Sequence, residues 1–253
     1  MEHFDLHSIV AEWLSATPDR HTLIAASLDG TVWRLDGTAR ALYSHRERPA
    51  QTAISENGRL LASCARNGSI AVFDLVSSRL VSTRFAHSAG DCGIGWDADE
   101  LWSSGADGAF RTWQVRGDRL VPNHLMQAPA SLHMTKVIQH TWAAAEGTNA
   151  FAIGTVDGST LGRLDLGGVI TALEISADRR YIAASVKDEI VVVDLERHAI
   201  ATALFGAPVR QLAFFDRDEL AFAQPDALRT LRLTQLNYVP FEWSPEPPNR
   251  ASF

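Results

Sequence analysis

Residues 67–74 of this chain read NGSIAVFD, and this octapeptide is the clearest guide to the fold. It begins with a polar turn, Asn67 and Gly68, continues as a short apolar run and ends on an aromatic residue followed by Asp74. The same arrangement returns along the chain, so that six copies of one unit can be aligned. The other five copies are DGTVWRLD at 29–36, DGAFRTWQ at 107–114, DGSTLGRLD at 157–165, KDEIVVVD at 187–194 and PDALRTLR at 225–232.

Each copy predicts a β-hairpin. A run of small and apolar residues precedes each turn, such as 60–65 before Asn67 and 23–27 before Asp29. Asp-Gly or Asn-Gly between two such runs is a strong hairpin signal, and the type I′ turn that it favours needs positive φ at both central residues. Because further apolar runs flank most hairpins, each unit of about 40 residues is expected to contain four short antiparallel strands and no long helix.

Six such units predict an all-β β-propeller of six four-stranded blades over residues 1–235, since stacking around an axis buries both faces of each small sheet. The alternative is an incomplete seven-bladed ring, either open or completed by another chain. Two segments compete to supply the outer strand that closes the ring, 2–7 and 236–243. Residues 236–253 are a distinct tail, rich in Pro and aromatic residues, that closes the ring or docks a partner.

The units resemble WD40 repeats, and the best match is LWSSGADGAFRTW at 101–113. By this resemblance, a structural tetrad of hydrogen bonds is expected among His87, Ser103, Asp107 and Trp113. Asp107 accepts from the ring of His87, which accepts from the Ser103 hydroxyl, which accepts from the indole of Trp113. Losing one link would strand a buried polar group at a cost of about 1–3 kcal/mol.

Other copies depart from the WD40 pattern. The second copy offers His45, Ser63 and Asn67 but has Phe73 in the place of the tetrad Trp. The fifth copy has Lys187 where the turn Asp is expected, and the dipeptide Trp-Asp does not occur in the chain. The resemblance therefore rests on the repeat period and the turn chemistry more than on signature residues.

Composition narrows the class of protein further. Hydrophobic residues make up 46% and charged residues 21%, which excludes wholesale disorder. The net charge of −7 argues against nucleic acid as the main partner. No apolar run reaches the length of a membrane span and the N-terminus lacks a secretory signal, so a cytoplasmic location is expected.

The use of particular residue types suggests the source of the chain and its redox compartment. Arg supplies 21 of the 23 basic residues, which suggests a GC-rich bacterial genome. Cys64 and Cys92 are interpreted as free thiols in a reducing compartment.

No reactive constellation stands out in the sequence. Nucleophile-elbow, zinc-protease, phosphate-loop and C-x-x-C motifs do not occur, and Glu174 and Asp91 are the only acids near the expected inner strands. We therefore expect no catalytic residue, no metal, no cofactor and no obligatory small molecule. The leading hypothesis is a non-catalytic scaffold for protein–protein interaction or a regulatory subunit of a multiprotein complex, a role that the WD40 resemblance implies. The alternatives are a six-bladed hydrolase or isomerase acting on a small molecule at the channel mouth, and a peptide-binding reader.

Two segments are candidates for contact with a protein partner. The 50-residue interval between the third and fourth turns is longer than the others, and residues 120–140 are expected to form an irregular surface segment that presents His124, Met126, His133 and Met134. The alternative is a surface connection that packs back onto the blades. The second candidate is the tail, whose Tyr238, Phe241 and Trp243 either anchor in a groove of another protein or cover the chain's own blades. Neither segment has the ligand spacing of a metal site.

Overall fold

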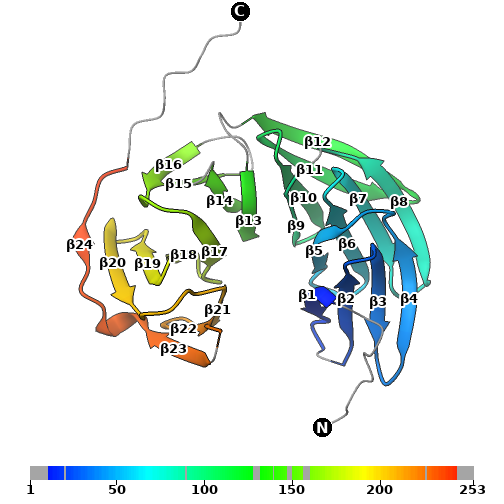
Figure 1. Cartoon of the computed structure of the whole chain (residues 1–253). Coiled ribbons are helices and arrows are strands. Elements are labelled where there is room, and N and C mark those ends of the chain that lie inside the picture. The colour runs from blue at the N-terminus through cyan, green and yellow to red at the C-terminus, as the bar shows by residue number, and fades with distance from the viewer. Residues whose placement is uncertain are drawn as a thin grey trace, which may run out of the picture. The chain divides into compact units, whose positions relative to one another are not determined.

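The computed structural model describes residues 11–243, except positions 20, 89, 128–131, 139, 147–149, 156–159 and 226. The regular secondary structure of these residues is almost entirely β-strand, with one short 3-10 helix, η1 (Leu233–Gln235) (Figure 1). The chain divides into two compact units, Met1–His133 and Met134–Phe253, each of which is described by itself. The all-β fold predicted from the repeat is confirmed.

The first unit contains three four-stranded antiparallel sheets, and the order of strands in each sheet follows the chain. The first sheet consists of β1 (Ala11–Ala16), β2 (Leu23–Ser27), β3 (Thr31–Leu35) and β4 (Ala39–Ser44). The second sheet consists of β5 (Pro49–Ile54), β6 (Leu60–Ala65), β7 (Ser69–Asp74) and β8 (Arg79–Phe85). The third sheet consists of β9 (Cys92–Asp97), β10 (Glu100–Gly105), β11 (Ala109–Arg116) and β12 (Arg119–Gln127). The first strands β1, β5 and β9 are neighbours, and β4, β8 and β12 are the outer strands.

The second unit contains three further antiparallel sheets. The fourth sheet consists of β13 (Leu132–Ile138), β14 (Thr141–Glu146), β15 (Ala150–Thr155) and β16 (Thr160–Asp165). The fifth sheet consists of β17 (Ile170–Ile175), β18 (Tyr181–Val186), β19 (Glu189–Asp194), β20 (Ala199–Leu204) and the short β24 (Val239–Pro240). The sixth sheet consists of β21 (Gln211–Asp216), β22 (Glu219–Ala223) and β23 (Leu228–Arg232).

The last two sheets differ from the expected four strands. Within the described residues the sixth sheet has three, and the chain leaves it through η1 to reach β24, which pairs with β20 (Figure 1). Leu233, Leu236 and Tyr238 pack on the core between the fifth and sixth sheets, and the chain then reaches β20, so that of segment 236–243 the residues Val239 and Pro240 pair with the fifth sheet and not with the sixth. That one of the two segments closes the ring stays a prediction. The competing segment 2–7 lies outside the described residues.

The hairpin turns are not of the predicted type I′. Gly68 has a φ of 81° and its N–H donates to the carbonyl of Ala65 at 2.9 Å, whereas Asn67 does not have a positive φ. Instead, Oδ1 of Asn67 accepts from the N–H of Ser69 at 3.0 Å. Gly30 and Gly108 repeat this geometry, which is that of a three-residue loop with one glycine in the left-handed region. The turn of the fourth copy and position 226 of the sixth lie outside the described residues.

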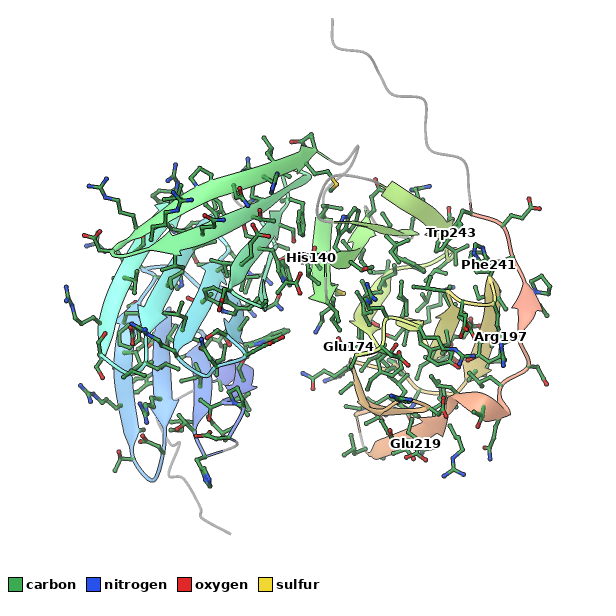
Figure 2. All side chains as sticks on the ribbon, turned by 180° about the vertical axis from the view of Figure 1, so that it is seen from behind. His140, Glu174, Arg197, Glu219, Phe241 and Trp243 are labelled. Carbon is green, nitrogen blue, oxygen red and sulfur yellow. A yellow bond between two sulfur atoms is a disulfide. The ribbon has the colours of Figure 1, made fainter. Side chains whose placement is uncertain are left out.

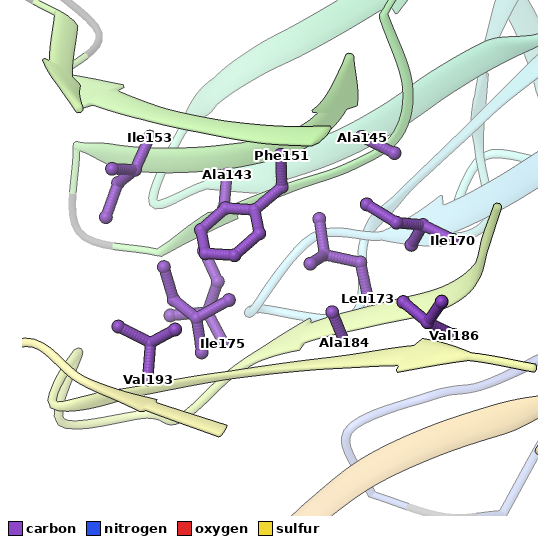
Figure 3. Close-up of a cluster of buried hydrophobic side chains, with 11 residues drawn as sticks. Ala143, Ala145, Phe151, Ile153, Ile170, Leu173, Ile175, Ala184, Val186 and Val193 are labelled. Atoms are coloured by element: carbon purple, nitrogen blue, oxygen red, sulfur yellow. The ribbon is translucent and has the colours of Figure 1, made fainter. Parts of the chain in front are cut away.

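Apolar side chains from neighbouring sheets form the cores of both units. Between the fourth and fifth sheets, Phe151 and Ile153 of β15 meet Ile175 of β17 and Val193 of β19 (Figure 3). Each of these four side chains is at most 2% exposed. Such packing buries both faces of each small sheet, which no four-stranded sheet achieves alone.

Cys64 and Cys92 form a disulfide, so the expectation of two free thiols is wrong. Cys64 lies on β6 of the second sheet and Cys92 on β9 of the third, with 6.3 Å between their Cα atoms. The side chains are buried in the core between these sheets. Their separation of 28 positions in the sequence gives no sign of this proximity, because stacking of the sheets brings them together.

Candidate functional site

The structure brings the four residues of the expected tetrad together in the third sheet. His87 Nδ1 lies 3.0 Å from Asp107 Oδ1, and its Nε2 lies 2.8 Å from Ser103 Oγ. The indole N–H of Trp113 donates to Ser103 Oγ at 2.8 Å. Ser103 on β10, Trp113 on β11 and His87, which precedes β9, are buried, and Asp107 lies in the turn between β10 and β11. The chain of hydrogen bonds therefore fixes the segment before the third sheet to its second and third strands.

One tautomer of His87 satisfies this chain. Ser103 accepts from Trp113, so its own hydroxyl hydrogen is free to donate to Nε2, and Nδ1–H donates to Asp107. Arg111 Nη1 also lies 2.9 Å from Nδ1, and because a guanidinium only donates, this contact is not a hydrogen bond in this tautomer. Arg111 Nη1 donates to the other carboxylate oxygen of Asp107 at 3.1 Å. Burial lowers the pKa of His87 despite its bond to Asp107, and this favours the neutral ring. The tetrad is thus a structural clamp and has no free acid or base.

The second sheet contains a related cluster, of which the sequence predicted His45 and Ser63 but not Tyr43 and Ser69. His45 Nε2 lies 2.6 Å from Ser63 Oγ, as expected, but its Nδ1 faces Ser69 Oγ at 3.1 Å and not Asn67. The place of the missing Trp is taken by Tyr43, whose hydroxyl lies 2.6 Å from Ser63 Oγ. Burial lowers the pKa of His45 to about 4. Tyr43 comes from β4 of the first sheet, so this cluster joins two sheets.

The candidate residues His124 and Met126 lie on β12, the outer strand of the third sheet. The expectation of an irregular segment is wrong here, because residues 119–127 pair with β11 and residues 132–138 form β13. A register shift opposite Thr112 accommodates Pro122, which has no N–H to donate to the ladder. His124 is exposed and Met126 is half-buried, so part of this strand is available to a partner.

The other two candidates of this segment lie on β13. Met134 is partly buried and packs against the core between the fourth and fifth sheets. The side chain of His133 lies outside the described part of the structure. Met134 is therefore less available to a partner than His124.

The aromatic residues of the tail pack on the second unit. Tyr238 contacts the core between the fifth and sixth sheets, and its ring centroid lies 6.5 Å from that of Tyr181. Phe241 and Trp243 pack on the core between the fourth and fifth sheets, with 4.9 Å between their ring centroids (Figure 2). The backbone N–H of Phe241 donates to the carbonyl of His198 at 3.1 Å. Of the two interpretations of the tail, this geometry matches the one in which the aromatics cover the chain's own blades.

A cavity of about 510 Å³ lies in the second unit, where β17 and β21 end. Its polar lining comprises Glu174, Asp178, Asp216 and Arg217, and Ile138 and Phe214 are among its apolar lining residues. Glu174 Oε2 accepts from Lys136 Nζ at 2.8 Å, and Asp178 Oδ1 accepts from the Ser176 hydroxyl at 2.7 Å. Two of its three carboxylates therefore take part in contacts that hold neighbouring strands and turns.

The described residues contain no group of three or more His, Cys, Asp or Glu side chains placed to hold a metal ion. Among these residues there is also no helix that is long and apolar enough to cross a membrane. The features that remain for function are the exposed outer strands, the cavity of the second unit and the groove between β8 and β12.

With this geometry in place, comparison with known proteins relates the chain to WD40 repeats. Residues 38–74 match the WD40 family, described as WD domain, G-beta repeat. This match runs from β4 through β7, so the repeat in the sequence combines the outer strand of one sheet with the first three strands of the next. The chain is 30% identical to Protein groucho of Drosophila melanogaster over 115 residues, which cover 42% of this chain and 16% of that protein.

Solved structures share the fold over nearly the whole chain. The crystal structure of the RRP9 WD40 repeats aligns with a TM-score of 0.77 and 15% identity, covering 92% of this chain and 80% of that chain. The structure of U3-55K aligns with a TM-score of 0.77 and 16% identity, covering 92% of this chain and 81% of that chain. The fold class is therefore that of the β-propellers, as the repeat predicts.

Proposed function

We propose that this chain is a non-catalytic module for protein–protein interaction, acting as a scaffold or as a regulatory subunit of a multiprotein complex. The match to WD40 repeats supports this role, and so do the two polar clusters, whose hydrogen bonds have a structural role, between two sheets at Tyr43 and within the third sheet at Trp113. Its cytoplasmic location and bacterial origin stay predictions from the sequence.

The observation that carries the proposal is the exposure of large apolar side chains on two outer strands of the first unit. Phe85 at the end of β8 is 75% exposed and Leu125 on β12 is 65% exposed. Contiguous exposed apolar patches mark surfaces that other proteins cover, and aromatic residues contribute strongly to such contacts, so the proposal takes Phe85 and Leu125 as parts of one contact surface. His124, the neighbour of Leu125 on β12, is also exposed.

The test is affinity capture from the native host with tagged wild-type chain and two variants, Phe85→Ser and Leu125→Asp. We expect a defined partner to be captured by the wild type and to be depleted with both variants, while their melting temperatures stay close to that of the wild type. Leu204→Asp is the matched control, since Leu204 is 70% exposed on the outer part of a different sheet. Equal capture by all four proteins would remove this surface from the proposal.

The cavity at the ends of β17 and β21 favours a second candidate, a hydrolase or isomerase that acts on a small molecule. Asp216 is the only carboxylate of the cavity that accepts no side-chain hydrogen bond within the described residues, so it is the natural candidate for a general base. Turnover of ester, lactone or sugar substrates that is abolished by Asp216→Asn would support an enzyme. Turnover that survives this change would arise elsewhere.

A further inference from the structure

A groove runs along the first unit between the outer strands of the second and third sheets. It has a volume of about 400 Å³ and is lined by Ser82, Thr83 and Arg84 of β8 and by residues 119–122 of β12. Leu120 is only 4% exposed and Val121 is half-buried, so they form an apolar floor between the two strands. The lining of the groove takes three consecutive residues of β8 and four of β12, and such a lining between two strands suits an extended chain.

Two arginines, Arg84 and Arg119, line this groove, and neither has a buried ion-pair partner among the described residues. The guanidinium of Arg84 lies 5.5 Å from the ring centroid of Trp113 and donates to the carbonyl of Leu120 at 3.3 Å. Among the described residues, no carboxylate lies within ion-pair distance of Arg84. Arg119 is 3.9 Å from Asp118, and both side chains are more than 80% exposed, so that this pair contributes little.

The outer strands of the first unit share this charge pattern. Strands β4, β8 and β12 contain four arginines and no Asp or Glu, although the whole chain has a net charge of −7. The four arginines are Arg40, Arg79, Arg84 and Arg119. An excess of one charge on one surface favours partners of the opposite charge and speeds their association.

The backbone of β12 is also suited to an extended partner. Within the described residues β12 pairs with β11 alone, so its other edge has no strand hydrogen-bonded to it. An edge strand with unpaired N–H and C=O groups can bind a further strand, and the side chains of that strand then supply the specificity. On the same two strands, Leu125 of β12 and Phe85 of β8 are exposed apolar side chains outside the groove lining.

We infer that this groove binds an extended acidic segment of a partner protein. Carboxylates of the segment would face Arg84 and Arg119, and its apolar side chains would contact Leu120, Val121 and Pro122. The inference rests on the proposed function, because it names the kind of segment by which a protein partner is recognised.

The experiment measures binding of a fluorescent ten-residue peptide, with alternating Glu and Leu or Val, to the full chain by anisotropy. Matched probes are the same peptide with Gln for Glu, the same peptide with Lys for Glu, and a single-stranded DNA oligonucleotide. We expect the acidic peptide alone to bind, with an affinity that falls as salt rises. Arg119→Glu should weaken binding about tenfold, since a groove cation becomes a repelling charge.

Two further variants separate recognition from folding. Arg84→Gln keeps the side-chain stem and a donor for the carbonyl of Leu120, so it should fold as the wild type and bind the acidic peptide several-fold more weakly. Arg229→Glu is the control, because Arg229 is an exposed arginine on β23 of the second unit. Equal binding of the Gln peptide, or no effect of Arg119→Glu, would overturn the inference, as would binding of the oligonucleotide in preference to the peptide. Partner capture that depends on Phe85 and Leu125 but shows no preference for acidic peptide would refute this inference and leave the proposed function standing.

Discussion

The indole of Trp243 packs over Gly162, and a Cβ at position 162 would collide with the ring. Gly162 lies on β16 of the fourth sheet, whereas Trp243 follows β24, which is paired to the fifth sheet. The ring of Trp243 also makes an edge contact with Phe151, with 6.3 Å between centroids. The C-terminal segment thus fastens two neighbouring sheets of the second unit, and the absence of a side chain at position 162 makes room for it.

We expect Trp243→Ala to lower the free energy of unfolding by about 1–3 kcal/mol, since the indole is half-buried and fills space between two sheets. Gly162→Ala should be destabilising in the wild type but nearly neutral in the Trp243→Ala background, because the ring that its methyl would meet has gone. Urea unfolding of the two single variants and the double variant measures this coupling. Strictly additive effects would contradict the contact, and Glu242→Ala, at an exposed neighbour, is the control.

The tetrad of the third sheet should matter more than the matching positions of the sixth. Asp107→Ala and Trp113→Ala each leave buried hydrogen-bonding groups without partners, so a loss of about 1–3 kcal/mol is expected, with an added packing loss for Trp113. Leu231→Ala, at the position of Trp113 in the sixth copy, should cost less because Leu231 is only partly buried and belongs to no polar cluster. Thermal melts of the three variants decide the order. A neutral Asp107→Ala would show that its contact with His87 is dispensable.

We expect removal of the hydroxyl group to affect stability differently at Tyr43 and at Tyr238. Tyr43→Phe removes a hydroxyl that lies 2.6 Å from Ser63 Oγ, so we expect a loss of about 1 kcal/mol. The hydroxyl of Tyr238 is buried without a hydrogen-bond partner among the described residues, so Tyr238→Phe should be neutral or stabilising. Chemical denaturation of both variants makes the comparison, and the reverse order would refute it.

Acid should destabilise the first unit through its buried histidines. Burial lowers the pKa of His45 to about 4, whereas an unfolded His titrates near about 6.5. Between these values the unfolded chain binds a proton that the folded chain does not, so stability falls as the pH drops, by about 3 kcal/mol at most for this group. His87 acts in the same direction, since burial also lowers its pKa.

The measurement is the free energy of unfolding as a function of pH for the wild type and His45→Gln. This variant should be less stable at neutral pH but should show a shallower fall between about pH 6.5 and about pH 4. His124→Gln, at an exposed position on β12, should keep the slope of the wild type. An unchanged slope in His45→Gln would show that other groups dominate the acid response.

Reduction of the Cys64–Cys92 disulfide should destabilise the first unit. The bond joins β6 of the second sheet to β9 of the third. It restricts the conformations of the unfolded chain, so breaking it raises the entropy of that state and should lower the free energy of unfolding by about 2–4 kcal/mol. Intact mass before and after treatment with a reducing agent detects the bond, and a thermal melt of Cys64→Ser measures its effect. A melting temperature that does not change on reduction would exclude a stabilising role.

The positions of most strands could be predicted from the pattern of apolar runs and turn residues. The strands expected at 23–27, 60–65 and 150–155 coincide with β2, β6 and β15, because small and apolar runs between turn residues leave few alternatives. The type of hairpin turn could not be predicted from the sequence in the same way. Asn67 and Gly68 suit both a two-residue and a three-residue loop, and only pairing of the flanking strands, with Oδ1 of Asn67 bonded to the N–H of Ser69, selects the second.

The repeat of turns and apolar runs was enough to predict the all-β propeller fold, and its resemblance to WD40 repeats predicted the four residues that meet in the third sheet. Tertiary structure alone decided the partners that come from other sheets: Tyr43 at Ser63, Cys92 at Cys64, and Trp243 at Gly162. It also turned the stretch around His124 into an ordered outer strand. The physical reason is that hairpins are set by neighbours in the chain, whereas contacts between sheets depend on how the sheets stack, and no pattern within one repeat records which residues of the next repeat will face it.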